Sequence, residues 1–262
     1  MPVNIIFIGD IVGNPGRHAL SQELHRLVDR YRADLVVANG ENAAGGFGLT
    51  EEVSREIFSA GVDVITGGNH IWDKREACSF LDVEDRIVRP ANYPEGVPGQ
   101  GSVVVTTPGG KKIGILNLEG RVFMNNLECP FRIADRLVEG LRSETSIIFV
   151  DIHAEATSEK IALGWYLDGR VSAVVGTHTH VQTADERVLP AGTAVITDAG
   201  MTGSFDSVIG MRKESVIQRF LTQLPVKFEV AKRDVRIQGV VVTVDEDTGR
   251  AAAIERFSIS CQ

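Results

Sequence analysis

The sequence predicts a layered α/β fold, in which strands and helices alternate along the chain. Short and almost wholly apolar runs recur, and longer amphipathic stretches separate them. Strands that are buried on both faces show such continuous apolar runs, because helices cover both sides of their sheet. The 27 glycines in 262 residues also suit the many tight turns that this alternation requires.

The individual elements follow from these patterns. We predict strands at Val3–Ile8, Leu35–Ala38, Val62–Thr66, Ile113–Leu118, Ile147–Val150, Ala173–Val175 and Ala194–Thr197. Apolar residues at helical spacing predict helices at Arg17–Tyr31, Glu51–Ala60, Ile133–Leu141 and Glu159–Leu167. Thr50 stands directly before the second of these helices, and its hydroxyl suits an N-cap.

The C-terminal part of the chain has a different pattern. Lys227–Ala231, Val235–Val244 and Ala251–Ile259 are predicted as successive antiparallel strands, with a hairpin turn at Asp245–Gly249. They predict a second, more antiparallel sheet beside the α/β body. No low-complexity linker or internal repeat divides the sequence, so we expect a single domain over residues 1–262.

Charge and composition restrict the function. A net charge of −8 argues against stable binding along DNA or RNA, although bound divalent cations would still allow a phosphorylated substrate. The three cysteines have no paired spacing, which indicates reduced thiols. We find neither a signal-peptide pattern nor a run of about 18 apolar residues, so we expect a cytoplasmic protein without membrane contact.

Polar residues gather directly after the apolar runs, at the predicted strand ends. They are Asp10, Glu41, Asn42, Asn69, His70, His153, His178 and His180. The carboxyl ends of parallel strands meet at one edge of a sheet, where ligands bind. Carboxylate, carboxamide and imidazole groups bind divalent Mn, Fe or Zn, so we predict a metal cluster at this edge. We expect His178 and His180, two residues apart, to share one face of an extended segment.

Other interpretations fit less well. A single Asp in a turn, like Asp10, or a single His after a strand, like His153, usually has a structural role, so only the coincidence of all these residues favours a metal cluster. The glycines of Gly9–Arg17 do not match GxGxxG, and no GK[ST] follows them. No GxSxG motif supports a serine hydrolase, and no cysteine lies in a comparable loop.

Five motifs in this sequence resemble those of the calcineurin-like metallophosphoesterases. In chain order they are GD at Gly9–Asp10, GEN at Gly40–Asn42, GNH at Gly68–His70, His153, and GTHTH at Gly176–His180. Longer strings, among them NGENAAGG, GNHIWDK and DIHAEATSEK, resemble the YmdB-like bacterial branch nearly from end to end. The resemblance implies a four-layer α-β-β-α sandwich of two mixed sheets, with two divalent ions, Fe or Mn and alternatively Zn, at one sheet edge.

The resemblance also implies a role for each residue of the site. The first ion would be bound by Asp10, Glu41, Asn42 and His180. The second would be bound by Glu41, Asn69, His153 and His178, so that Glu41 bridges the two. His70 would stay off the metals and serve as a general acid or as a transition-state stabiliser. Candidates for the substrate pocket are Arg17, Thr179, Gly200, Met201 and Thr202.

This sequence departs from the wider superfamily at two positions. The usual first motif is DxH, but its third position here is Val12, which makes Asn42 the natural substitute ligand. Glu41 stands where a bridging Asp is usual. Asp151 and Asp73, close in sequence to His153 and His70, are candidates for carboxylates that orient these imidazoles.

Together, the residues and the resemblance predict a dinuclear-metal phosphodiesterase that hydrolyses 2′,3′-cyclic or 3′,5′-cyclic nucleotides. A metal-bridging hydroxide would attack phosphorus, and His70 would protonate the leaving group. Two alternatives remain open: a phosphomonoesterase or a nuclease acting on RNA ends, and a regulatory protein with a structural metal site. We expect a small phosphodiester substrate and a homo-oligomer.

Overall fold

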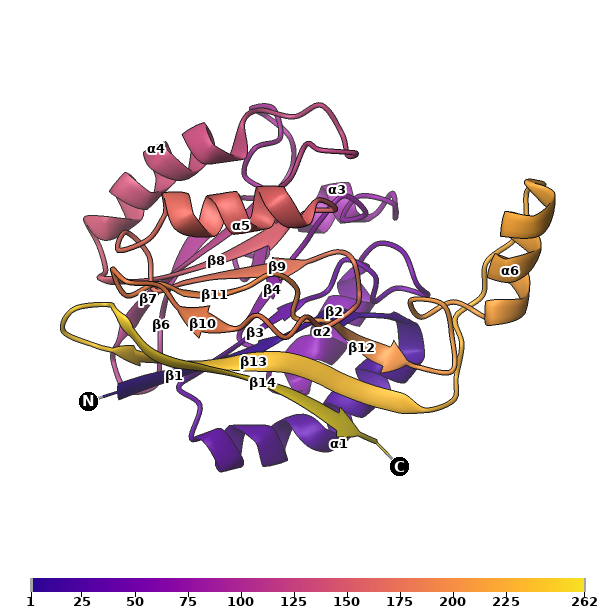
Figure 1. The fold of residues 1–262 in the computed structure, drawn as a ribbon, viewed down its shortest axis with the longest axis horizontal. Coiled ribbons are helices and arrows are strands. Elements are labelled where there is room, and N and C mark those ends of the chain that lie inside the picture. Colours follow the sequence, from indigo (N-terminus) through magenta and orange to yellow (C-terminus); the bar gives the residue numbers. More distant parts are fainter. Residues whose placement is uncertain (1, 262) are drawn as a thin grey trace.

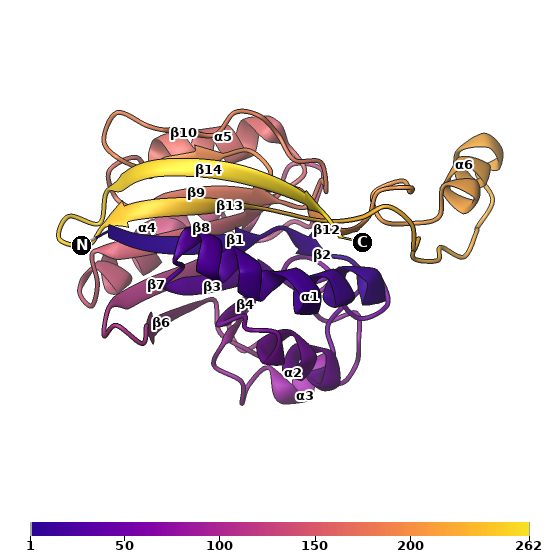
Figure 2. The same cartoon turned by 90° about the horizontal axis from the view of Figure 1, so that it is seen from below.

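Two mixed sheets pack face to face and helices cover their outer faces, as the computed structural model of the chain shows for residues 2–261 (Figure 1). The inner faces form one apolar core, in which the rings of Phe7 and Phe149 stack at 5.3 Å. The long helix α1 (Gly13–Tyr31) and α2 (Glu51–Ser59) cover the first sheet (Figure 2). The second sheet is covered by α4 (Pro130–Arg142) and α5 (Thr157–Tyr166). The expected four-layer α-β-β-α sandwich is therefore confirmed.

The first sheet has the order β2-β12-β13-β1-β3-β4-β5, with β14 paired to β13. Its strands are β1 Pro2–Ile8, β2 Asp10–Ile11, β3 Leu35–Asn39, β4 Val64–Thr66, β5 Ile87–Val88, β12 Met201–Ser204, β13 Val235–Asp245 and β14 Ala251–Ser260. Strands β1, β3, β4 and β5 are parallel, whereas β13 is antiparallel to β1. The C-terminal β13 thus lies in the middle of the sheet that the N-terminal strand begins.

The second sheet has the order β10-β11-β9-β8-β7-β6. Its strands are β6 Ser102–Thr106, β7 Lys112–Glu119, β8 Ile147–His153, β9 Ala173–Thr177, β10 Arg187–Val188 and β11 Ala194–Ile196. The four inner strands are parallel, and the two edge strands run antiparallel to their neighbours. The carboxyl ends of β7, β8 and β9 therefore lie side by side.

The tail of the chain differs from the sequence-based expectation. β13, β14 and the turn at Asp245–Gly249 are confirmed, but they join the first sheet, because residues 239–245 of β13 pair with the whole length of β1. The predicted strand Lys227–Ala231 is wrong. Its only ladder partner in residues 2–261 is a single bridge from Val230 to Met211, so the alternating pattern has no sheet to join. The predicted N-cap is confirmed, since Thr50 Oγ1 accepts a hydrogen bond from Val53 N at 3.2 Å.

One segment stands apart from the sandwich. We call residues 205–233 the arm; it contains the helix α6 (Lys213–Thr222), which projects from one end of the molecule (Figures 1 and 2). Within α6 only Val216 is buried, and Phe220 and Leu221 are largely exposed. The remaining helix, α3 (Ala77–Phe80), is a single short turn against the first sheet. Of the helices in residues 2–261, none has the length and apolar composition needed to cross a bilayer.

Candidate metal centre

The structure brings all eight predicted metal-centre residues to one edge of the sheets. Each lies at or just beyond the carboxyl end of a strand: Asp10 after β1, Glu41 and Asn42 after β3, Asn69 and His70 after β4, His153 at the end of β8, and His178 and His180 after β9. Parallel strands β3 and β4 in one sheet and β8 and β9 in the other place these ends together. The prediction that strand ends gather the polar residues is confirmed.

His153 lies at the centre of one group of ligand atoms. Its Nε2 is 3.1 Å from Glu41 Oε1, 3.1 Å from Asn69 Oδ1 and 3.0 Å from His178 Nδ1. Ligand atoms of Glu41, His153 and His178 all lie within 4.8 Å of one another. This spacing allows one cation to contact all three side chains.

A second group lies on the other side of Glu41. Asn42 Nδ2 donates to Glu41 Oε1 at 3.0 Å and lies 3.2 Å from His180 Nε2. His180 Nε2 is also 3.6 Å from Asp10 Oδ1. Glu41 therefore stands between the two groups, in the place expected of a bridging ligand.

Hydrogen bonds on the outer side of each imidazole show which nitrogen carries the proton. Thr177 Oγ1 donates to Asp151 Oδ1 at 2.7 Å, so it accepts from His153 Nδ1 at 2.9 Å. His178 Nε2 lies 3.1 Å from Glu155 Oε2, and His180 Nδ1 lies 2.9 Å from the Ile209 carbonyl oxygen. In neutral rings the nitrogens that face the centre consequently present lone pairs.

These lone pairs make the donor set fit a metal. His153 Nε2 and His178 Nδ1 face each other and the carboxylate of Glu41, so these groups need a shared cation, which is the proton of His153 in the metal-free protein and can be a metal ion instead. Asp10 Oδ1 is buried and has no hydrogen-bond partner among residues 2–261, which is costly unless an ion binds it. Imidazole, carboxylate and carboxamide together suit Mn, Fe or Zn.

The electrostatics of the centre agree with this interpretation. Burial lowers the pKa of His153, but the carboxylates of Glu41 and Asp10 outweigh burial and raise it to about 9. Burial and the neighbouring His153 together lower the pKa of His178 to about 3, so its ring is neutral at pH 7. The site therefore attracts positive charge, which a divalent cation supplies in place of a proton.

The two histidines of the GTHTH motif do not share the face of an extended strand, so that expectation is wrong. β9 ends at Thr177, and His178 and His180 have φ values of 97° and 63°. Such left-handed conformations are unfavourable for residues with side chains and persist where the surroundings fix them. Here Asp10 Oδ2 accepts a hydrogen bond from His178 N at 3.2 Å, which draws the turn towards the centre.

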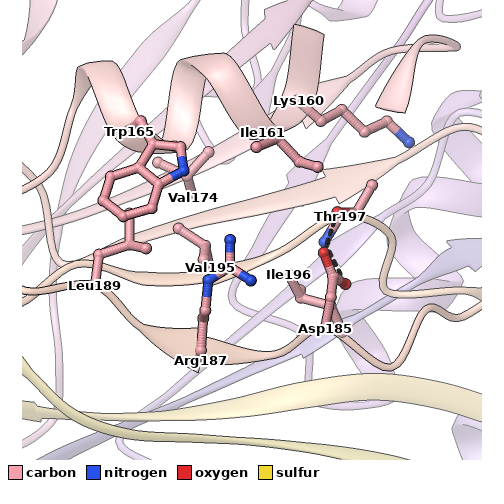
Figure 3. A pocket seen from close by; sticks show the side chains of 11 residues that line it. Lys160, Ile161, Trp165, Val174, Asp185, Arg187, Leu189, Val195, Ile196 and Thr197 are labelled. Carbon is pink, nitrogen blue, oxygen red and sulfur yellow. Dashed lines mark hydrogen bonds between the residues drawn. The ribbon is translucent and has the colours of Figure 1, made fainter. Parts of the chain in front are cut away.

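A buried ion pair supports the same turn from behind. Asp198 Oδ2 accepts hydrogen bonds from the backbone and the hydroxyl of Thr179, at 3.1 and 2.7 Å, and contacts Lys160 Nζ at 2.8 Å. Figure 3 shows Lys160 at one end of a narrow cavity between α5 and the second sheet, with Trp165 at the other end. That cavity measures about 10 Å³, so it has no room for more than a water molecule.

The glycine of the GNH motif is required by close packing around the ligands. A Cβ atom on Gly68 would lie 2.5 Å from the ring of His153 and closer still to Glu41 Oε2. Any larger residue would displace one of these two side chains, because both are buried.

A cavity of about 560 Å³ opens over the centre. Its lining combines metal-centre residues with Phe47 and residues of the arm. Of the five predicted pocket residues, Thr179 lines this cavity, whereas within residues 2–261 the lining does not include Arg17, Gly200, Met201 or Thr202. Arg17 instead binds Glu56 at 2.7 Å and the Ala43 carbonyl at 2.6 Å, and Met201 pairs with Asp10 along β12 and β2.

A protein-family model matches a range of the chain that includes all the residues of the metal centre. The family model described as "YmdB-like protein" matches residues 6–257. The chain belongs to the YmdB-like family. A relative from Bacillus subtilis (strain 168), named 2′,3′-cyclic-nucleotide 2′-phosphodiesterase, is 51% identical to it over 98% of this chain and 97% of the relative.

Solved structures of similar proteins agree with the fold. A hypothetical protein from Thermus thermophilus has a TM-score of 0.93 at 45% identity, over 99% of this chain and 100% of that one. A protein described as a novel phosphatase from Mycoplasma pneumoniae has a TM-score of 0.93 at 37% identity, over 99% and 94%. The family model and the Bacillus relative confirm the sequence resemblance to the YmdB-like branch.

Proposed function

We propose that this YmdB-like protein is a metal-dependent phosphoric diester hydrolase that acts on 2′,3′-cyclic nucleotides. The observation that carries the proposal is the convergence of imidazole nitrogens and buried carboxylate oxygens beneath an open cavity. The name of the Bacillus relative supports a cyclic diester as the substrate.

We infer that the centre holds two ions. The proposed ligands of the first are Asp10, Glu41, Asn42 and His180, and those of the second are Glu41, Asn69, His153 and His178. The position of Glu41 between the two groups supports its role as the bridge. Asn42 turns Nδ2 rather than Oδ1 towards His180, so binding by Asn42 requires its amide to turn over.

When bound, divalent cations would neutralise charge on the phosphoryl oxygens and make a water molecule nucleophilic at neutral pH. The chain's own residues prepare for this. Neutral His178 directs a lone pair at the centre, and the outer bond of His153 Nδ1 makes Nε2 the nitrogen that would give up its proton to a metal ion. Fe, Mn and Zn all suit these ligands.

His70 is our candidate for the general acid. Its backbone N–H donates to Glu41 Oε2 at 3.0 Å, but its ring lies outside the group of ligand atoms and lines the cavity. Asp73 Oδ2 holds Nδ1 at 2.8 Å and the ring of Phe47 packs against it edge-on at 5.1 Å. This leaves Nε2 facing the substrate, and the doubly protonated, imidazolium form of His70 would give its Nε2 proton to the leaving alkoxide oxygen, which is a poor leaving group without one.

The test is hydrolysis by metal-stripped protein that is titrated with Mn²⁺ or Fe²⁺. Substrates are 2′,3′-cyclic AMP, 3′,5′-cyclic AMP, bis-p-nitrophenyl phosphate and the monoester p-nitrophenyl phosphate, with Asp10→Ala as the control. We expect diester hydrolysis that saturates near two metals per chain and is lost in the control. Turnover of the monoester alone would favour a phosphatase, and no turnover at full metal loading would favour a structural metal site.

A further inference from the structure

The cavity over the metal centre has two chemically different walls. Its floor is polar and includes Glu41, His70 and His178. The rest of the lining belongs mostly to the arm and is mainly apolar, with Met211, Phe220 and Phe228 among its residues. A ligand that fills the cavity would contact the metal-centre residues with one part and apolar side chains of the arm with another.

Two aromatic residues of the arm are exposed. Phe220 is 73% exposed and Phe228 is 38% exposed, although both line the cavity. Exposed apolar surface in a concave site is typical of a surface that a ligand covers. Aromatic rings bind nucleobases well, because every base offers a flat π-face and stacking loses little by changing the base.

Polar groups lie beside these rings at the end of α6. Arg219 and Gln223 line the same wall. Arg219 Nη1 donates to the Gln223 carbonyl at 3.0 Å, and Gln223 Nε2 donates to the Phe220 carbonyl at 3.1 Å. A guanidinium has five donors and a carboxamide oxygen accepts, so this corner can pair with the edge of a base.

We propose that the arm is the nucleobase-binding site of this enzyme, with Phe220 and Phe228 stacking on the base and Arg219 and Gln223 contacting its edge. The proposal rests on the proposed function, because the phosphate of the same molecule lies on the metal centre. A volume of about 560 Å³ is within the range of small-ligand sites, roughly 300–1,000 Å³. The arm then determines which substrates bind well, and the metal centre determines the reaction.

The experiment compares a substrate that has a base with one that lacks it. KM and kcat are measured by ³¹P NMR for 2′,3′-cyclic AMP and for ribose 2,3-cyclic phosphate, with wild type, Phe220→Ala and Leu221→Ala. Leu221 is the matched control, since it is 81% exposed on the same helix and is not among the cavity-lining residues within 2–261. Both side chains are exposed, so neither change threatens folding.

We expect Phe220→Ala to raise KM for 2′,3′-cyclic AMP by about 10-fold, as the loss of one stacking contact implies, and to leave ribose 2,3-cyclic phosphate unchanged. Adenosine should inhibit wild type competitively and the variant about 10-fold more weakly, while Leu221→Ala should match wild type. Equal effects on both substrates, or equal effects of the two substitutions, would overturn the nucleobase site. Failure of wild type to hydrolyse either substrate would instead overturn the proposed function.

Discussion

Thr177→Val should weaken metal binding, although Thr177 is not a ligand. The Thr177 hydroxyl joins two buried groups, since it accepts from His153 Nδ1 at 2.9 Å and donates to Asp151 Oδ1 at 2.7 Å. Valine has the same shape without the hydroxyl. The substitution therefore removes the bond that fixes the proton on the outer nitrogen of His153.

The substitution should lower both the stability of the protein and its affinity for metal. Each buried polar group left without a partner costs about 1–3 kcal/mol, so losing both bonds lowers the free energy of unfolding by roughly 2–6 kcal/mol. A histidine ligand without its outer partner typically binds metal about 10- to 100-fold more weakly. Thr66→Val is the matched control: Thr66 Oγ1 donates to the other oxygen of Asp151 at 2.5 Å, where Asn39 also donates at 3.2 Å.

The assay combines Mn²⁺ titration by calorimetry with thermal unfolding of the metal-free protein. We expect both variants to lose stability and only Thr177→Val to lose metal affinity. Equal Mn²⁺ affinity in the two variants would show that the Thr177 hydroxyl does not orient His153.

Three further predictions concern the same region. His70→Ala should keep its metal content but lose about 10²- to 10⁴-fold in kcat; metal content as low as that of His153→Ala, measured by elemental analysis, would contradict this role. Burial raises the pKa of Glu119 from 4.5 to about 7, so the stability that its protonated form contributes is present at low pH and is lost as the pH rises through 7. Glu119→Gln should flatten the fall in melting temperature of the metal-free protein between about pH 5 and pH 8. Mn²⁺ at about 100 times its Kd should stabilise the wild-type protein by about 2.7 kcal/mol, whereas Asp10→Ala should gain less at the same concentration.

The sequence predicted the buried core well and the rest of the fold only in part. β1, β3 and β8 are continuous apolar runs because both of their faces are covered, and such runs are visible without a structure. β12 was not predicted, because Met201–Ser204 has no such run and exists only through its pairing with β2 and β13. α6 was also missed, since it buries little against the sandwich.

The site, like the fold, was predictable in part: the metal-centre residues could be found from the sequence, and the residues of the arm could not. Eight polar residues could be found because strand ends concentrate them, and their grouping follows from the parallel sheets. The arm could not be found in this way, because Phe220 and Phe228 have no chemical signal until the fold places them over the metal centre. Glu155 could not be singled out either, because only the structure shows that its Oε2 lies 3.1 Å from His178 Nε2.

The central position of β13 has a consequence for the order of events during synthesis. Asp10 lies where β1 ends, yet β1 pairs with β13, more than two hundred residues later in the chain. A ribosome-bound chain that has not yet released residues 235–245 therefore lacks the partner that completes the first sheet. Contacts of such long sequence separation form slowly. We expect the metal centre to form only after translation is nearly finished. An incomplete chain would then bind metal ions poorly, because the first sheet that positions Asp10 is not yet complete.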